Sequence, residues 1–244
     1  MRSPYGLQIV ESCIACPVRN ETFACNLSAP ALKALNSIKA TAAYPRGAIL
    51  CLEGQPPRGI FILCSGRAKV YSTSKEGKNI ILRIAEPGEI IGLSAAISGD
   101  PYEATVETLQ PSQVNFIPRA DFLALLQRYP DAALKIGDQL VHNCKRAYEE
   151  IRSLGLSHTV SEKLAKLLLH WADHARNGSN SNELQIKVSL THDEIAQMIG
   201  SSRETVTRIF GELKRKNLIR VRGASLTILN RAGLERMIRP RGVH

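Results

Sequence analysis

The sequence lacks the features that mark membrane proteins, secreted proteins and common enzymes. No charge-free run reaches the roughly 18 residues that a membrane helix needs, so we expect no membrane partner. Residues 1–14 have no apolar core of a secretion signal, which predicts a reducing cytoplasm. There is no nucleophile–base pair, phosphate-binding glycine loop or His/Glu metal triad, and we therefore expect no enzyme activity.

The positive charge is concentrated at one end of the chain. The 244 residues carry a formal net charge of +10, with 44% hydrophobic and 22% charged residues, as expected for a folded protein of one or two domains. Residues 201–244 hold eleven Lys and Arg but three Asp and Glu, a net charge of +8, which leaves +2 for residues 1–200. Such a basic block is typical of a surface that binds a polyanion, although a merely solvated surface is the alternative.

Short strands separated by glycine turns dominate residues 44–117. The pattern predicts an antiparallel β-roll or jelly roll, with Glu76-Gly77-Lys78 at the tip of a hairpin. A capped helix following Ser28 precedes it, and a short helix over 118–128 follows it. The expected strands cover residues 48–52, 60–63, 68–71, 80–84, 89–91 and 113–117.

A long helix is expected after Pro130, because apolar residues there follow a heptad spacing. A second stripe, Leu134, Val141 and Tyr148, lies on another face of the same helix. One stripe can pack on the roll and the other on a two-fold-related copy, which favours a homodimer over a helix buried within a monomer. The predicted dimer seam contains Leu140, Cys144, Ala147 and Ile151.

The C-terminal part contains two short helices separated by a glycine. Thr191 and Glu194 fit a capping box, and the helix that they open stops at Gly200. Residues 201–204 fit a second capping box, so the pair predicts a helix-turn-helix, with a helical hairpin that does not bind DNA as the alternative. Residues 155–158 are expected to form a hinge before this part, and residues 184–188 a short strand.

The second of these helices separates its residues by face. Apolar residues occupy one side, whereas two arginines and a glutamate lie in the first two turns of the other. These turns are what a recognition helix presents to the major groove, where Arg bonds guanine and Glu accepts from cytosine. Residues 218–222 and 226–229 form an expected two-stranded wing. The predicted DNA-binding residues are Ser202, Arg203, Glu204, Thr207, Arg208, Arg220 and Arg222, with Ser202 and Thr207 assigned to phosphate or secondary contacts.

These motifs resemble the cAMP receptor protein/FNR (CRP/FNR) family of bacterial transcription regulators along nearly the whole chain. The most specific match is Leu190-Thr191-x-x-Glu194-Ile195-Ala196-x-x-Ile199-Gly200, followed by Ser202-Arg203-Glu204-Thr205-Val206-x-Arg208. The resemblance implies an α+β fold: an N-terminal cyclic-nucleotide-binding-like roll, a long dimerisation helix and a C-terminal winged helix-turn-helix. It also implies double-stranded DNA and RNA polymerase as partners.

The resemblance further assigns base reading to Arg203, Glu204 and Arg208 and implies a palindrome of TGTGA-like half-sites. The FNR type lacks the first arginine and prefers a different outer base. On this basis we divide the chain into a Cys-containing segment (1–28), a β-roll sensor (29–128), a dimerisation helix with a hinge (129–156) and a DNA-binding domain (157–244).

The sensor segment departs from the cyclic-nucleotide binders of the family. Those binders hold the ribose with a Glu and the phosphate with an Arg. Here Leu93 and Tyr102 take these positions, and Glu103 would repel a phosphate. We therefore expect neither cAMP nor cGMP. The candidate ligand-pocket residues are Gly92, Leu93, Ser94, Tyr102 and Glu103, in a segment that looks more like the FNR branch.

Three N-terminal cysteines, Cys13, Cys16 and Cys25, resemble the iron–sulfur motif of FNR proteins. Their last spacing is longer than usual, and Asn115 stands where the roll cysteine of FNR is expected. The fourth ligand is therefore open among the remaining cysteines, Cys51, Cys64 and Cys144. An iron–sulfur cluster, another metal site, cluster remnants and redox thiols all remain candidates.

The sequence therefore predicts a homodimeric transcription regulator controlled by a signal at the roll or the cysteine segment. The competing hypothesis is a metal or redox sensor whose primary output is not transcription. It shares the cysteines but does not explain the helix-turn-helix.

Overall fold

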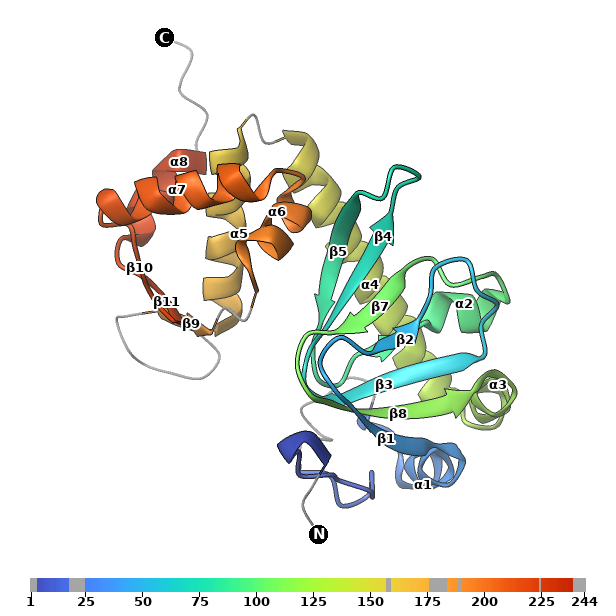
Figure 1. Cartoon of the computed structure of the whole chain (residues 1–244). Helices are drawn as coiled ribbons and strands as arrows, with labels where there is room; N and C mark the ends of the chain where they lie inside the picture. Colours follow the sequence, from blue (N-terminus) through green and yellow to red (C-terminus); the bar gives the residue numbers. More distant parts are fainter. Residues whose placement is uncertain are drawn as a thin grey trace. The chain divides into compact units, whose positions relative to one another are not determined.

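The computed structural model describes residues 4–17, 25–156, 159–175, 184–187, 190–223 and 225–238. The chain forms two compact units, Met1–Lys145 and Arg146–His244 (Figure 1). The boundary between the two units falls inside the long helix, and it differs from the boundaries of the four segments predicted above. No helix in the described part of the chain has the length and apolar character of a membrane span.

The first unit is a β-roll built from two four-stranded antiparallel sheets. One sheet has the order β1-β8-β3-β6 and the other β2-β7-β4-β5. The hairpin between β4 and β5 closes at Gly77, whose positive φ of 79° suits glycine. The strands are β1 (Ala40–Tyr44), β2 (Ile49–Cys51), β3 (Gly59–Ser65), β4 (Ala68–Thr73), β5 (Asn79–Ala85), β6 (Ile90–Ile91), β7 (Thr105–Thr108) and β8 (Ser112–Pro118).

Each predicted strand of the roll is present, and two further strands were not predicted. Strand β1 reads Ala-Thr-Ala-Ala-Tyr, which carries few of the β-branched and aromatic residues typical of strands. Strand β7 is short, and its buried Thr108 hydroxyl donates to Pro45 O at 2.6 Å. Pairing with strands distant in the sequence therefore stabilises both strands, and no local sequence pattern identifies them.

The helices of the first unit cover an apolar layer on one sheet. This layer includes Leu35 of α1, Ile60 and Ile62 of β3, Phe122 of α3 and Ile136 of α4. A second apolar layer lies around Phe61, Leu63 and Val114, facing the other sheet. The helices are η1 (Pro4–Gly6, a 3-10 turn), α1 (Ala29–Ile38), α2 (Leu93–Ser98), α3 (Arg119–Arg128) and α4 (Pro130–Leu156).

The long helix α4 is confirmed, but it continues through Gly155 and Leu156, where a hinge was predicted. Gly155 is the last but one residue of the helix, and a single helical glycine costs only about 1 kcal/mol. Residues 157 and 158, the rest of the predicted hinge, lie outside the described residues.

In the described residues, the second unit joins the end of α4 and helices α5 to α8 to a three-stranded sheet of order β10-β11-β9. Its core contains Leu164 and Leu168 of α5, Ile195 of α6, Ile209 of α7 and Leu234 of α8. Strand β9 extends the predicted two-stranded wing by pairing with β11. The elements are α5 (Val160–Ala175), β9 (Leu184–Lys187), α6 (His192–Ile199), α7 (Arg203–Arg215), β10 (Ile219–Arg222), β11 (Ser225–Ile228) and α8 (Arg231–Ile238).

Candidate functional sites

Helices α6 and α7 form the predicted helix-turn-helix, and local capping explains where each begins. The Thr191 hydroxyl accepts from the Glu194 N–H at 3.2 Å, and the Glu194 carboxylate accepts from the Thr191 N–H at 2.7 Å. This is the predicted capping box. Gly200 ends α6 in the left-handed conformation, with φ of 62° and ψ of 49°.

The second predicted capping box is wrong in its register. The cap of α7 is Ser202, whose hydroxyl accepts from the Thr205 N–H at 3.2 Å. Glu204 is therefore the second residue of the helix and does not reach back to the cap. Because its carboxylate has no capping role, it remains at the exposed surface of the first turn.

The face of α7 opposite the core carries the predicted reading residues. Val206, Ile209 and Phe210 are buried on one side. Arg203, Glu204, Thr207 and Arg208 are exposed on the other. Arg208 forms an ion pair with Glu212 one turn later, at 2.6 Å, although 65% of its side chain remains accessible. Such an exposed pair is worth little and can open when a stronger anion approaches.

Two of the predicted phosphate contacts already have partners within the protein. The Ser202 hydroxyl caps α7, as described above. The Thr207 hydroxyl donates to the Arg203 carbonyl at 2.8 Å and lies 2.9 Å from Nδ1 of His192. His192, the first residue of α6, was not predicted to be part of this face.

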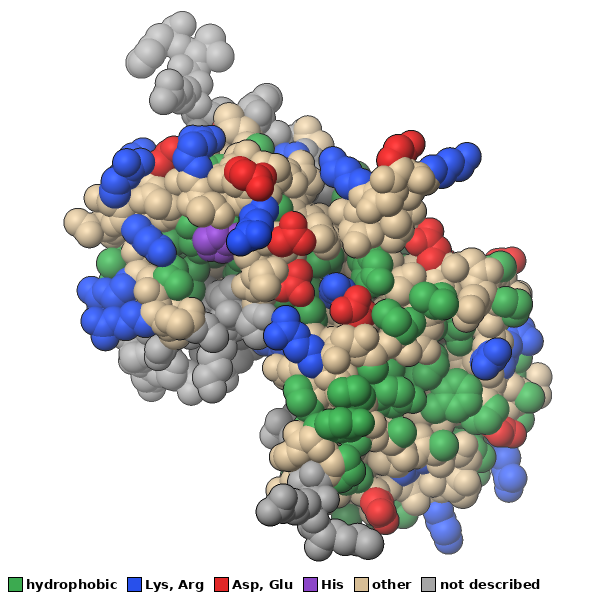
Figure 2. Space-filling model, viewed as in Figure 1, with side chains coloured by type: hydrophobic (Ala, Val, Ile, Leu, Met, Phe, Trp, Pro, Cys, Tyr) green, Lys and Arg blue, Asp and Glu red, His purple; other side chains and the backbone are tan. Residues whose placement is uncertain are grey.

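The wing places two arginines at the surface. Ile219 is buried, whereas Arg220 and Arg222 are exposed and separated by one strand residue, which puts them on the same side. Gly223 follows with a φ of 56°. Figure 2 shows Lys and Arg side chains spread over the surface of α7 and the wing. The exposed members are Arg203, Arg208, Lys214, Arg215, Lys216, Arg220 and Arg222.

Tyr102, one of the predicted ligand-pocket residues of the roll, is buried. Tyr102 is 5% exposed, and its hydroxyl donates to the Gly59 carbonyl at 2.7 Å and accepts from the Gly59 N–H at 3.3 Å. Its ring lies against Gly92, where an added Cβ would come within 2.7 Å of it. Burial raises the pKa of this phenol. Tyr102 therefore packs as a core residue at this position.

The other candidate residues of this segment divide between core and surface. Leu93 is buried in the apolar layer under α3, Ser94 is half-buried, and Glu103 is exposed. Gly92 caps α2 in the left-handed conformation. At the two positions that hold ribose and phosphate in cyclic-nucleotide binders of the family, this chain therefore presents buried Leu93 and Tyr102.

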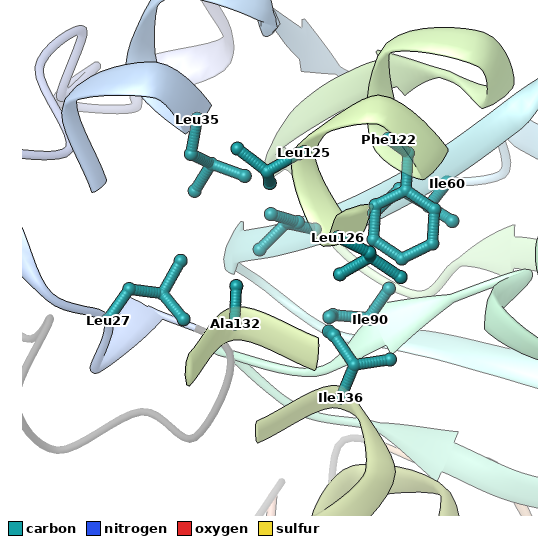
Figure 3. Close-up of a pocket in the computed structure, with 10 residues that line it drawn as sticks. Leu27, Leu35, Ile60, Ile90, Phe122, Leu125, Leu126, Ala132 and Ile136 are labelled. Carbon is teal, nitrogen blue, oxygen red and sulfur yellow. The ribbon is translucent and has the colours of Figure 1, made fainter. Parts of the chain in front are cut away.

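An apolar pocket lies elsewhere in the same unit, between the roll and helices α1, α3 and α4 (Figure 3). Its lining includes Leu27, Leu35, Phe122, Leu125 and Ile136, which point toward one another in the close-up. All ten lining residues are apolar, so the pocket offers no side-chain donor or charge to a nucleotide.

The N-terminal cysteine segment packs on the roll. Cys13 is buried, its N–H donates to the Asn36 side chain at 2.9 Å, and the Asn115 amide donates to its sulfur at 3.6 Å. Asn115, which stands where FNR proteins are expected to carry a cysteine, thus contacts the first cysteine of the motif. A hydrogen-bond chain continues from Asn115 to Thr41 and Lys39.

Cys64 joins this neighbourhood from strand β3. The register between β3 and β8 shifts between Leu63 and Ser65, so Cys64 lies at a β-bulge, a feature that redirects a side chain. Burial raises the pKa of Cys64 to about 12, helped by the thiols of Cys25, Cys13 and Cys16 and opposed by Lys39. Cys64 is therefore the roll cysteine that lies near the motif, which the sequence had left open.

The remaining cysteines have different surroundings. Cys51 is buried, and burial raises its pKa to about 12 against the opposing effect of a backbone hydrogen bond at Val106; its thiol donates to the Ala104 carbonyl at 3.9 Å. Cys144 is exposed on α4. Among the described residues, no three Cys, His, Asp or Glu side chains are arranged to hold a metal ion. The motif thiols and Cys64 share a neighbourhood, but within the described residues they are not arranged as a ligand set for a metal ion.

The predicted dimer seam of α4 divides between two faces. Leu140 packs against the apolar layer of the roll, whereas Cys144, Ala147 and Ile151 are exposed. The second stripe is also exposed, with accessible fractions of 74% for Leu134, 55% for Val141 and 63% for Tyr148. The unpartnered apolar face of α4 is therefore offset from the predicted one.

Comparisons with known proteins agree with this architecture. The cyclic nucleotide-binding domain family matches residues 41–129, and the Crp-like helix-turn-helix domain family matches residues 162–237. The cAMP-activated global transcriptional regulator CRP of Salmonella typhimurium is 28% identical over 186 residues, 76% of this chain and 87% of that protein. The CRP-like cAMP-activated global transcriptional regulator of Mycobacterium tuberculosis is 26% identical over 197 residues, 80% of this chain and 87% of that protein.

Solved structures show the same fold. FixK2 from Bradyrhizobium japonicum superposes with a TM-score of 0.72 at 18% identity, covering 84% of this chain and 100% of that one. The c-di-GMP-responsive regulator CLP of Xanthomonas campestris gives a TM-score of 0.71 at 19% identity, covering 82% and 99%. With a roll, a long helix and a helix-turn-helix in the same order, the chain belongs to the CRP/FNR family of transcription regulators.

Proposed function

We propose that the protein is a homodimeric regulator that reads a palindrome of TGTGA-like half-sites and responds to a signal other than a cyclic nucleotide. The observation that carries the DNA reading is the exposed Arg203, Glu204 and Arg208 face beside the basic wing. Arg and Glu at the start of a recognition helix discriminate G·C pairs in the major groove. RNA polymerase is the further partner that the family implies.

The DNA assignment is tested by fluorescence anisotropy at fixed salt, with a TGTGA palindrome and a scrambled duplex of equal length. We expect the wild type to prefer the palindrome and Arg203→Ala to lose most of this preference, at a cost of about 1–3 kcal/mol. Lys75→Ala removes one exposed charge from the β4–β5 hairpin and serves as the matched control. Equal binding of both duplexes by the wild type would refute the assignment.

The homodimer proposal rests on the exposed apolar face of α4. Leu134, Val141 and Tyr148 repeat every seven residues, and Cys144 and Ile151 lie three residues after Val141 and Tyr148, at the complementary heptad positions. A second copy of the same helix is the partner that such a self-complementary seam suits. Ala147 flanks this seam, and Leu140 faces the roll.

The seam is tested by light scattering on the purified full-length chain. The wild type should have the mass of a dimer, and Val141→Asp should shift it toward the monomer, because a charge in the seam loses its hydration. His142→Asp introduces the same charge at the adjacent exposed position and should leave the dimer intact. A monomeric wild type would exclude the proposal.

The signal is proposed to enter through the cysteine segment and not through the cyclic-nucleotide position. The burial of Tyr102 and Leu93 supports the exclusion of the cyclic-nucleotide position. Calorimetric titration with cAMP should therefore give no binding heat, and binding at micromolar concentrations would overturn the proposal.

Entry of the signal through the cysteine segment is supported by the neighbourhood that four thiols share, those of Cys13, Cys16, Cys25 and Cys64. Because the described thiols do not form a ligand set for a metal ion, we assign no role to a metal.

Iron, zinc and sulfide analysis of anaerobically purified protein distinguishes metal binding from thiol chemistry. Metal retained by Cys51→Ser and lost in Cys64→Ser would indicate a four-thiolate site, whereas metal-free wild type would point to thiol chemistry. An unchanged DNA affinity on substitution of all four thiols would refute the cysteine input.

A further inference from the structure

His192 is a side chain of α6 that lies directly on the recognition helix. Its Nδ1 is 2.9 Å from the Thr207 hydroxyl, and its ring stacks on Phe210 with centroids 4.7 Å apart and an interplanar angle of 27°. Phe210 is buried in the core of the unit, whereas Thr207 is exposed on the reading face. One imidazole therefore contacts both faces of α7.

The hydrogen bonds define which nitrogen of His192 carries the proton. The Thr207 hydroxyl has one hydrogen, and it donates this hydrogen to the Arg203 carbonyl at 2.8 Å. The hydroxyl must then accept from Nδ1–H of His192. Nδ1 donates in both the neutral and the charged ring, so the contact with Thr207 persists when Nε2 gains a proton.

The charges facing the ring from α7 are both positive. Burial lowers the pKa of His192 below its usual value, and Lys214 and Arg203 lower it further. On its own helix, Asp193 follows His192 and accepts a hydrogen bond from the Gln197 amide. The free protein therefore holds His192 neutral near pH 7, with a protonation site beside a basic surface.

We propose that His192 makes DNA binding proton-linked: the imidazole takes up a proton when a duplex docks on the face formed by Arg203, Thr207 and Arg208. This inference rests on the DNA-reading function proposed above. The negative charge of a duplex docked on this face offsets the positive potential of Arg203 and Lys214, which disfavours the charged ring. The bound state then holds the proton more tightly than the free state, and binding strengthens as the pH falls.

The expected effect is limited to one proton per protomer. Each unit by which the duplex raises the pKa of His192 corresponds to a tenfold gain in affinity once the site is charged. We expect roughly three- to tenfold tighter binding per half-site at pH 5.5 than at pH 7.5, and a flat response above pH 7.5, where both states are neutral.

The test is an anisotropy titration of the full chain with the TGTGA palindrome from pH 5.5 to 8.0 at constant ionic strength. His192→Gln keeps an N–H donor but cannot titrate, so it should lose most of the pH dependence. His142→Gln, an exposed histidine on α4, should retain it. An equal pH dependence in wild type and His192→Gln would overturn the proposal.

A second measurement does not depend on the variant. The ring C–H resonance of His192 in the wild type, followed by NMR against pH with and without the duplex, should titrate at higher pH in the complex. An unchanged midpoint would contradict the proposal even if His192→Gln failed to fold. A wild type that binds no duplex would instead refute the DNA-reading function, and this inference with it.

Discussion

In the winged unit the side chains of Arg203, Glu204 and Arg208 stand exposed, whereas in the roll Leu93 and Tyr102 are buried at the positions compared with a nucleotide site. The three exposed charged side chains contribute little to the packing of the core, so binding of a partner explains their identities best. Leu93 and Tyr102 are explained by packing alone. In this chain the winged unit therefore presents charge at its surface, whereas the roll packs the two residues compared with a nucleotide site into its core.

The largest effect is expected from the loss of the buried Tyr102 ring in the roll. Tyr102→Ala removes a buried ring and both hydrogen bonds to Gly59, and we expect the roll to lose about 3–5 kcal/mol of unfolding free energy. Urea unfolding followed by circular dichroism measures the loss. Tyr5→Ala, at a residue that is 56% exposed, is the control and should change the stability by less than about 0.5 kcal/mol. A loss below about 1 kcal/mol for Tyr102→Ala would mean that the ring does not pack as a core residue.

The next effect tests whether the wing supplies phosphate contacts. Replacing Arg220 and Arg222 together by Ala should weaken binding to all duplexes alike, because phosphates carry no base sequence. The slope of log affinity against log salt should fall by about 0.9 for each lost contact. Anisotropy titrations between low and physiological salt measure this slope. A selective loss for the palindrome, with an unchanged slope, would instead assign these arginines to base reading.

The smallest effect concerns the ion pair on the reading face. Glu212→Gln removes the carboxylate that competes with DNA for Arg208, and it should raise affinity modestly while costing about 0.3–0.5 kcal/mol of stability. Parallel binding and thermal unfolding experiments separate the two quantities. Weaker binding in this variant would show that Glu212 holds Arg208 in its reading position.

Local signals made the helix-turn-helix predictable from the sequence. The Thr191–Glu194 capping box lies within four residues, and the buried face of α7 follows from the helical period alone. The error at Ser202 is also local: two adjacent serines can cap the helix, and the spacing to Glu204 favoured Ser201, whereas Ser202 caps it.

The features that sequence missed depend on contacts between distant residues. Strand β9 joins the wing by pairing with β11, and Cys64 approaches Cys13 across a bulge that pairing with β8 creates. On α4, two apolar stripes satisfied the heptad pattern, and only packing against the roll showed that Leu140 belongs inside. His192 was missed because its partner, Thr207, lies on another helix.

The most direct test of the central claim pairs Arg203 with one base pair. Affinities of wild type and Arg203→Ala are measured on the TGTGA palindrome and on a duplex whose outer G·C pair is changed in both half-sites. We expect the wild type to discriminate the two duplexes by about 1–3 kcal/mol per half-site and Arg203→Ala not to discriminate them. If the variant kept the full discrimination of the wild type, the assignment of base reading to this face of α7 would be contradicted.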